Sequence, residues 1–210
     1  IKNNKIILIF VAVFVLFISY LLLPTFYNQS DISKQLKNEI QNKLNLNFEF
    51  SQNLKYNFFP KPHFTTTESA LLDNKTEISE ISKLKIFVSY DNFFSLKNIE
   101  IKDLILENAN FNLNKKNYNF FQNLLNKRFE NTDFIIKDSN IFFRNSEDEV
   151  LFINKIIKIK YYYDKKELRN FFYSENEIFN IPFTMETYFN KDKSKIFSQI
   201  YLKLIKLKIE

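Results

Sequence analysis

Residues 84–90 read LKIFVSY and residues 99–113 read IEIKDLILENANFNL, with apolar side chains at alternating positions over most of both stretches. Alternate side chains of a β-strand lie on opposite faces of a sheet, so this period predicts strands with one apolar face. The sequence therefore predicts a mainly β protein built from a long series of antiparallel strands. The apolar positions of the pattern are Leu46, Phe48, Phe50, Leu54, Tyr56, Phe58, Leu84, Ile86, Val88, Tyr90, Ile99, Ile101, Leu104, Leu106, Ala109, Phe111, Leu113, Phe134, Ile136, Ile141, Phe143, Ile157, Ile159, Tyr161, Tyr163, Ile200, Leu202 and Leu204.

Turns between these strands are expected to use Asn, Asp, Lys and Ser, because the chain contains no glycine. Asn is among the non-glycine residues that most readily adopt a positive φ angle. A short helix is expected at about residues 120–129. The expected turns lie at residues 91–92, 114–117, 137–140, 145–148 and 190–193.

Residues 6–23 form an uncharged apolar run, IILIFVAVFVLFISYLLL. As a helix that rises about 1.5 Å per residue, the run would be about 27 Å long, close to the roughly 30 Å hydrocarbon core of a bilayer. We therefore expect a transmembrane anchor. A cleaved signal peptide is the main alternative, but its apolar region is shorter and Leu23 is not followed by a small-x-small cleavage site. The anchor residues singled out are Ile6, Phe10, Phe14, Phe17, Leu21 and Leu23.

Two lysines, Lys2 and Lys5, precede the anchor, and positively charged residues tend to stay on the cytoplasmic side. The short N-terminus is therefore expected in the cytoplasm, and everything after Pro24 on the other side of the membrane. Because the chain starts with Ile1 and stops within a strand-like pattern, we expect it to be part of a longer protein. The expected division is an N-terminus at residues 1–5, the anchor at 6–23, an amphipathic helix at 30–45 and a β-rich domain from 46 to 210 and beyond.

The amphipathic helix is predicted from Ile32, Leu36, Ile40 and Leu44, which recur every four residues and fall on one stripe. Ser30-Asp31 offers an N-cap. The apolar stripe suits either the bilayer surface or the end of a sheet, and the helix is short for a surface anchor. A sheet-capping helix is favoured.

Something must cover the apolar face of the predicted sheet. In a sandwich, two such faces pack on each other. In a curved, groove-like sheet, the inner face stays open as an apolar trough, and an exposed patch of that size usually marks a binding site. Periodicity alone does not separate these two architectures.

The composition argues against most enzyme classes. Without glycine or cysteine, the chain has no ordinary phosphate-binding glycine loop, cysteine nucleophile or thiolate metal site. His63 is the sole histidine, and it is expected to be a surface or strand residue because a base needs partners. The net charge of +6 comes from lysines that alternate with acidic residues, which does not indicate a nucleic-acid surface. We expect no enzyme activity, no cofactor, no metal and no nucleic-acid partner.

Four stretches follow one another in a distinctive order. They are the run ending at Leu23-Pro24 with the helix at 32–44, residues 54–64 (LKYNFFPKPHF), residues 84–90 with 93–113, and residues 134–143 (FIIKDSNIFF). In this order they resemble the N-terminal region of the AsmA family, which is related to TamB and the bridge-like lipid-transfer proteins. The family often has glycine where this chain has Asn47 or its neighbours, Asn98 and Ser139.

The resemblance implies a protein of the Gram-negative envelope, anchored in the inner membrane with a periplasmic β-rich body. It implies a role in phospholipid transport between membranes, outer-membrane assembly and envelope maintenance, with acyl chains held in the groove. The alternative is a membrane-tethered module with a closed β-sandwich that docks envelope protein partners. The residues expected to contact lipid are Ile86, Val88, Tyr90, Ile99, Ile101, Leu104, Leu106, Phe111 and Leu113.

Overall fold

The computed structural model describes residues 2–50, 53–73, 76–91, 93–95, 99–126, 132–190, 195–202 and 207–209. Strands make up more than half of the described residues, so the fold is mainly β as predicted. The helices are α1 (Lys2–Leu22), the 3-10 helix η1 (Leu23–Phe26), α2 (Gln29–Leu44) and α3 (Tyr118–Asn126). The strands are β1 (Asn47–Glu49), β2 (Lys55–Asn57), β3 (His63–Asp73), β4 (Thr76–Val88), β5 (Ile101–Leu113), β6 (Asp133–Arg144), β7 (Val150–Asp164), β8 (Arg169–Ile178), β9 (Ile181–Asn190), β10 (Lys195–Leu202) and β11 (Leu207–Ile209).

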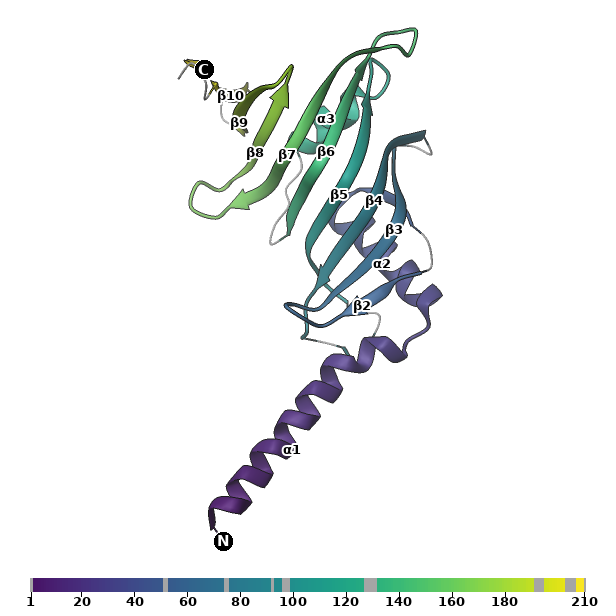
Figure 1. Cartoon of the computed structure of the whole chain (residues 1–210), viewed down its shortest axis with the longest axis vertical. Helices are drawn as coiled ribbons and strands as arrows, with labels where there is room; N and C mark the ends of the chain where they lie inside the picture. Colours follow the sequence, from purple (N-terminus) through teal and green to yellow (C-terminus); the bar gives the residue numbers. More distant parts are fainter. Residues whose placement is uncertain are drawn as a thin grey trace.

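All eleven strands belong to one sheet, in the order β1-β3-β4-β5-β6-β7-β8-β9-β10-β11, with β2 also paired to β3. The sheet is open, because β1 and β11 lie at its two ends and do not close it. Figure 1 shows the sheet twisting from β3 to β10, with α2 and α3 behind it. The described strands therefore do not form the two-sheet sandwich, and they fit the curved, groove-like sheet.

The expectation of antiparallel strands is wrong at one place, where β5 and β6 run parallel from Asp103↔Asp133 to Leu113↔Phe143. A parallel pair needs a crossover connection. The segment with α3 provides it, and the turn at 114–117 leads into this helix through Asn114, whose Oδ1 accepts from the backbone N–H groups of Lys116 and Asn117. The predicted helix at 120–129 is found as α3, and residues 127–129 lie outside the described residues.

The turn predicted at 137–140 is also wrong, because these residues lie inside β6. Asp138 has a φ of 48° there and bends the strand instead of reversing it. The turn predicted at 145–148 is present between β6 and β7. Of the turn predicted at 91–92, the structure describes only Asp91. Residues 191–193, Asn98 and Leu204 lie outside the described residues.

A line of bends crosses the middle of the sheet. Three residues on this line have positive φ angles: Glu68 (56°), Asn108 (53°) and Asp138 (48°). The pairing between neighbouring strands skips these three residues, and it also skips Ser82 on β4 and Ile157 on β7. Interruptions of this kind let a sheet curve. This line therefore explains how the sheet bends without glycine.

Serine hydroxyls replace the ladder hydrogen bonds that this line removes. The Ser139 Oγ accepts from the Ala109 N–H at 2.9 Å and donates to the Lys137 carbonyl at 2.6 Å. The Ser82 Oγ donates to the Asn108 carbonyl at 3.0 Å. Because buried backbone groups need partners, the Ser139 hydroxyl makes the bend compatible with a folded sheet.

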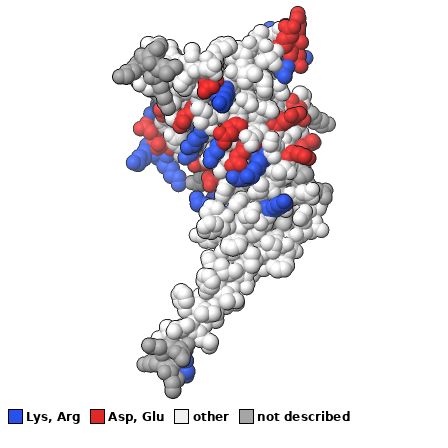
Figure 2. Space-filling model, viewed as in Figure 1, with Lys and Arg blue, Asp and Glu red and all other residues white. Residues whose placement is uncertain are grey.

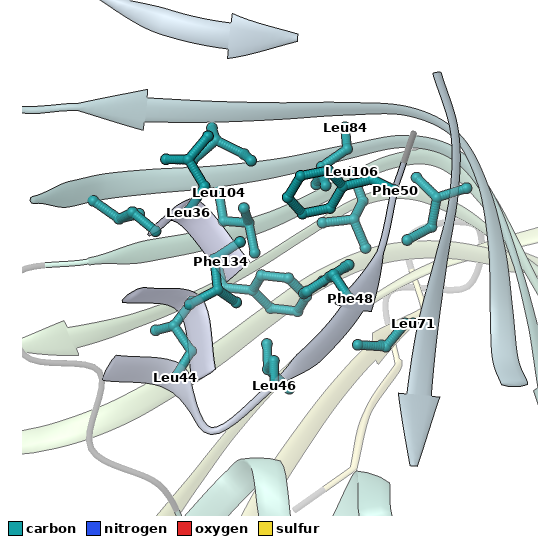
Figure 3. Packing of buried hydrophobic residues seen from close by; sticks show 14 of the residues in the cluster. Leu36, Leu44, Leu46, Phe48, Phe50, Leu71, Leu84, Leu104, Leu106 and Phe134 are labelled. Carbon is teal, nitrogen blue, oxygen red and sulfur yellow. The ribbon is translucent and has the colours of Figure 1, made fainter. Parts of the chain in front are cut away.

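Helix α2 covers the inner face of the first strands. Asn28 caps it by accepting from the Ser30 N–H at 2.8 Å, so the helix begins slightly earlier than the Ser30-Asp31 cap expected from the sequence. Its stripe is buried against the sheet together with Phe48, Leu84 and Leu104 (Figure 3). The helix thus lies across the face of the sheet, not at its end, and its stripe is not free to lie on a bilayer. The buried stripe residues are Ile32, Leu36, Ile40 and Leu44.

Helix α1 stands apart from the sheet (Figure 1). The run Lys5–Phe26 has a mean hydropathy of 3.2 and is long and apolar enough to cross a membrane. Its side chains at Ile6, Phe10, Phe14 and Phe17 are exposed. Leu21 and Leu23 differ from them, because they are partly buried against the core. The chain thus has one N-terminal helix consistent with a single-pass membrane anchor.

Candidate functional site

One row of mostly apolar side chains crosses the inner face from the helix-covered core to the far strands. Its members pair strand by strand, so they lie on the same face. Helix α2 covers the start of this row, and the face beyond it is a hollow. The row consists of Leu84, Leu106, Ile136, Ile159, Ser174, Met185 and Ile200.

The hollow, which we call the trough, has a volume of about 380 Å³. This volume is within the range of roughly 300–1,000 Å³ that is usual for small-molecule sites. The trough is lined mainly by β5 to β10, with Leu71 of β3, and lies under α3. At α3, Phe121 meets Phe111 edge to face at 6.3 Å between ring centroids. The lining residues are Leu71, Phe111, Leu113, Tyr118, Phe121, Phe134, Ile136, Ile141, Ile156, Ile159, Tyr161, Phe172, Met185, Thr187, Ile196 and Ser198.

The described lining carries no charged side chain and few polar groups. The Thr187 and Ser198 hydroxyls lie 3.0 Å apart and hydrogen-bond to each other. Burial raises the pKa of Tyr161 well above the ordinary value for tyrosine, so its hydroxyl stays neutral. A surface of this kind suits an apolar ligand and offers nothing to hold a charged one.

The outer face of the same sheet has the opposite character. Figure 2 shows Lys, Arg, Asp and Glu gathered over the strands on the face away from α2 and α3. Lys160 pairs with Asp133 at 2.8 Å, and Lys83 with Glu107 at 3.3 Å. Burial pushes the pKa of Glu107 up, but its hydrogen bonds and attraction to Lys85 and Lys83 outweigh burial and hold it below its usual value. The outer face is thus a solvated, ion-paired surface.

The residues predicted to contact lipid divide into three groups. Phe111 and Leu113 line the trough. Tyr90 is exposed near the end of α1. The other six are buried in the core cluster that includes the α2 stripe, which leaves them little surface for a ligand, because α2 and the neighbouring strands cover them. These six are Ile86, Val88, Ile99, Ile101, Leu104 and Leu106.

Several trough residues were missing from the sequence-based prediction. Phe134, Ile136, Ile159 and Tyr161 belong to predicted strands but were not singled out as contacts. Phe172, Met185, Thr187, Ile196 and Ser198 were not recognised at all. On β8 the inner positions are Phe172, Ser174 and Asn176, and the two polar residues hide the alternation that would have marked the strand.

The contacts of His63 are those of a structural residue. Its Nδ1 lies 2.8 Å from the Lys61 carbonyl oxygen, and its ring stacks on Phe87 with 4.9 Å between centroids. Among the described residues, no group of three or more His, Cys, Asp or Glu side chains is placed to hold a metal ion. The geometry around His63 therefore gives no support for a catalytic or metal-binding role.

The end of α1 is fastened to the sheet body by tyrosines. The Tyr20 hydroxyl donates to the Tyr90 carbonyl at 2.6 Å and accepts from the Phe93 N–H at 3.0 Å. The Tyr56 hydroxyl donates to the Leu21 carbonyl at 2.8 Å, and that of Tyr27 to the Phe93 carbonyl at 2.6 Å. Burial, with a smaller contribution from Tyr20, raises the pKa of Tyr56 to about 12. We call this set of contacts the joint.

Comparison with known families matches residues 1–134 to the model of the AsmA family. The matched part contains α1, the joint, α2 and β1 to β5, and it ends at the start of β6. No curated protein sequence matches the chain.

Proposed function

This chain belongs to the AsmA family, and from that membership we propose that it holds phospholipid acyl chains in the trough as a membrane-anchored protein of the bacterial envelope. In this proposal it takes part in phospholipid transport between membranes, and so in outer-membrane assembly and envelope maintenance. The working surface is the trough on β5 to β10, not the region under α2.

The observation that carries the proposal is an apolar hollow on an open sheet. The described lining is uncharged, and it combines Phe111 and Leu113 with side chains from α3 and β6 to β10. Soluble proteins seldom leave a contiguous apolar surface of this kind uncovered unless something binds there. An acyl chain suits a lining that is mostly apolar and carries no charge.

The energetics favour reversible holding over tight capture. Each methylene moved from water to an apolar surface gains roughly 0.8 kcal/mol. A lipid that comes from a bilayer starts from surroundings as apolar as the trough, so its net gain is small. The trough would therefore replace the bilayer during passage through water, which is what transport requires.

Membrane attachment in this proposal comes from α1. Lys2 and Lys5 lie at its start, so the N-terminus is placed in the cytoplasm and the sheet in the periplasm, with the inner membrane as the site of anchoring. The AsmA family is not known as an enzyme family, and we propose a non-enzymatic role for this chain.

The proposal can be tested by the phospholipid that co-purifies with the full chain. Met185 lines the trough, and Thr184 precedes it on the outer face of β9. Met185→Asp should co-purify only with the lipid that surrounds the anchor, because it loses the phospholipid bound in the trough. Thr184→Asp should keep both. Lipid mass spectrometry gives the amounts, and circular dichroism shows that both variants are folded.

A folded Met185→Asp variant with unchanged lipid would contradict the proposal. A peptide found in the trough of the unaltered protein, in place of lipid, would also contradict it and would favour docking of a protein partner.

A further inference from the structure

Large aromatic side chains are exposed at the end of the sheet that meets α1. They come from η1, from the turn between β2 and β3, and from the segment after β4. Phe26, Phe59 and Phe94 are 82%, 79% and 77% exposed, and Phe58 and Tyr90 are exposed as well. We call these five residues the aromatic base.

The joint fixes the aromatic base to the end of α1. The Phe94 ring packs against the Tyr20 ring with 4.9 Å between centroids, and the Tyr90 carbonyl accepts from the Tyr20 hydroxyl. Tyr56, which bonds to the Leu21 carbonyl, belongs to the same hairpin as Phe58 and Phe59. The base therefore cannot leave the end of α1 without breaking these contacts.

The depth of Tyr20 sets the depth of the base. The uncharged run at residues 6–23 would span about 27 Å of the roughly 30 Å hydrocarbon core. Tyr20 is inside this run, three residues before its end. A side chain that packs on Tyr20, as Phe94 does, must then lie at the boundary between hydrocarbon and headgroups.

The surface at this end is suited to that boundary. Figure 2 shows that the uncharged surface of α1 continues onto the adjoining end of the sheet body. Tyr and Trp rings are enriched at the membrane–water interface, and amphipathic surface helices bury Phe at the same boundary.

We propose that the aromatic base inserts into the interfacial layer of the bilayer that α1 spans, and that the protein is thus seated on the membrane as well as tethered to it. This proposal rests on the proposed membrane anchor. Because α1 and the base hold the body at separate points, the sheet has a fixed tilt, and the strands β6 to β10, which lie far from α1 in Figure 1, stand away from the bilayer.

Spin-label depth measurements on the full chain test this seat. The chain has no cysteine, so Phe94→Cys, Phe59→Cys and Phe179→Cys each create a unique labelling position. Phe179 is 76% exposed, in the turn between β8 and β9, and is the matched control. In vesicles of phosphatidylethanolamine and phosphatidylglycerol, labels at 94 and 59 should collide more with oxygen than with a water-soluble nickel complex, and the label at 179 should do the reverse.

A label at Phe10→Cys separates failure of the seat from failure of the anchor. If position 10 is in lipid while 59 and 94 behave like 179, the seat is wrong and the anchor stands. If position 10 is also in water, both are wrong. Shielding of 59 and 94 from both reagents would assign the base to a protein contact and would overturn the proposal. If one of the two labelled variants does not fold, the other decides.

Discussion

The Tyr56 hydroxyl is one of the groups of the joint that connect α1 to the sheet body. It donates to the Leu21 carbonyl at the end of α1, and its ring packs on Phe64 with 5.1 Å between centroids. The same burial that positions it raises its pKa from 10.0 to about 12. The protonated form is therefore the one that the folded protein stabilises.

Tyr56→Phe should lower the free energy of unfolding by about 1 kcal/mol, because one partly buried hydrogen bond is lost. The folded protein keeps the Tyr56 proton between pH 10 and about pH 12, where the unfolded chain has lost it. Its contribution is thus complete below pH 10 and declines as the pH rises to about 12. Denaturant unfolding of the full chain in detergent micelles measures both effects.

Tyr118→Phe is a suitable control, because the Tyr118 side chain is exposed on α3. An identical alkaline decline in Tyr56→Phe and in the unaltered protein would contradict this account of the joint.

Ser139 makes the bend in β6 possible. Its hydroxyl both accepts from the Ala109 N–H and donates to the Lys137 carbonyl, and the residue is buried. Ser139→Ala should therefore lower the free energy of unfolding by about 1–3 kcal/mol, since it leaves a buried N–H without a partner. Thermal unfolding followed by circular dichroism measures this loss.

Ser79→Ala is the control for Ser139→Ala. Ser79 is also buried, but its hydroxyl makes a longer bond of 3.3 Å to the Glu80 carbonyl. If both variants lose the same stability, the hydroxyl of Ser139 has no special part in the bend.

The residues that bend the chain were only partly predictable. A chain without glycine must place other residues at positive φ, and Asn45, which ends α2 at a φ of 48°, is of a type that readily accepts it. The bend near Ser139 falls on Asp138. Glu68, Leu168 and Phe179 also have positive φ, and their residue types give no sign of it, because the surrounding sheet imposes the conformation.

At the scale of elements, α2 decides which part of the sheet is core and which part is open. It places Leu36 and Ile40, which are fully buried, over the inner face of the first strands. Beyond the reach of α2, the same face becomes the trough. The buried positions were predicted from their period, and the helix was expected at the end of the sheet. Its place over the face of the first strands was not predicted, because a period of two is the same for a covered and an uncovered face.

Leu36→Ala should lower the free energy of unfolding by about 2–5 kcal/mol, because it removes buried methyl groups and leaves a cavity. Lys34→Ala on the exposed side of α2 is the matched control and should change it by less than about 0.5 kcal/mol. Denaturant unfolding in micelles compares the two. Equal small losses would mean that α2 is not part of the core.

The parallel pairing of β5 and β6 could not be read from the strands themselves. Their alternating patterns are compatible with either direction, and only the length of the connection separates the two. The helix at 120–129 was predicted as an interruption, whereas in the structure α3 belongs to the crossover and forms part of the trough wall through Tyr118 and Phe121.

For the molecule as a whole, the two faces of one open sheet differ in chemical character. The outer face carries ion pairs, and the inner face is closed by α2 at one end and open at the other. The sequence was enough to predict the mainly β fold, the long apolar N-terminal helix and the family. It was not enough to place the site, because Phe172, Met185 and Thr187 come together only through the register of β8 and β9.

The most direct test of the central claim is photo-crosslinking from two neighbouring positions on β8 of the full chain in membranes. Phe172 lines the trough, and Tyr173 points to the outer face of the same strand. With a benzophenone amino acid at each position in turn, we expect a phospholipid adduct at 172 and little or none at 173. No adduct at 172, or equal adducts at both positions in folded protein, would contradict the claim that the trough holds lipid.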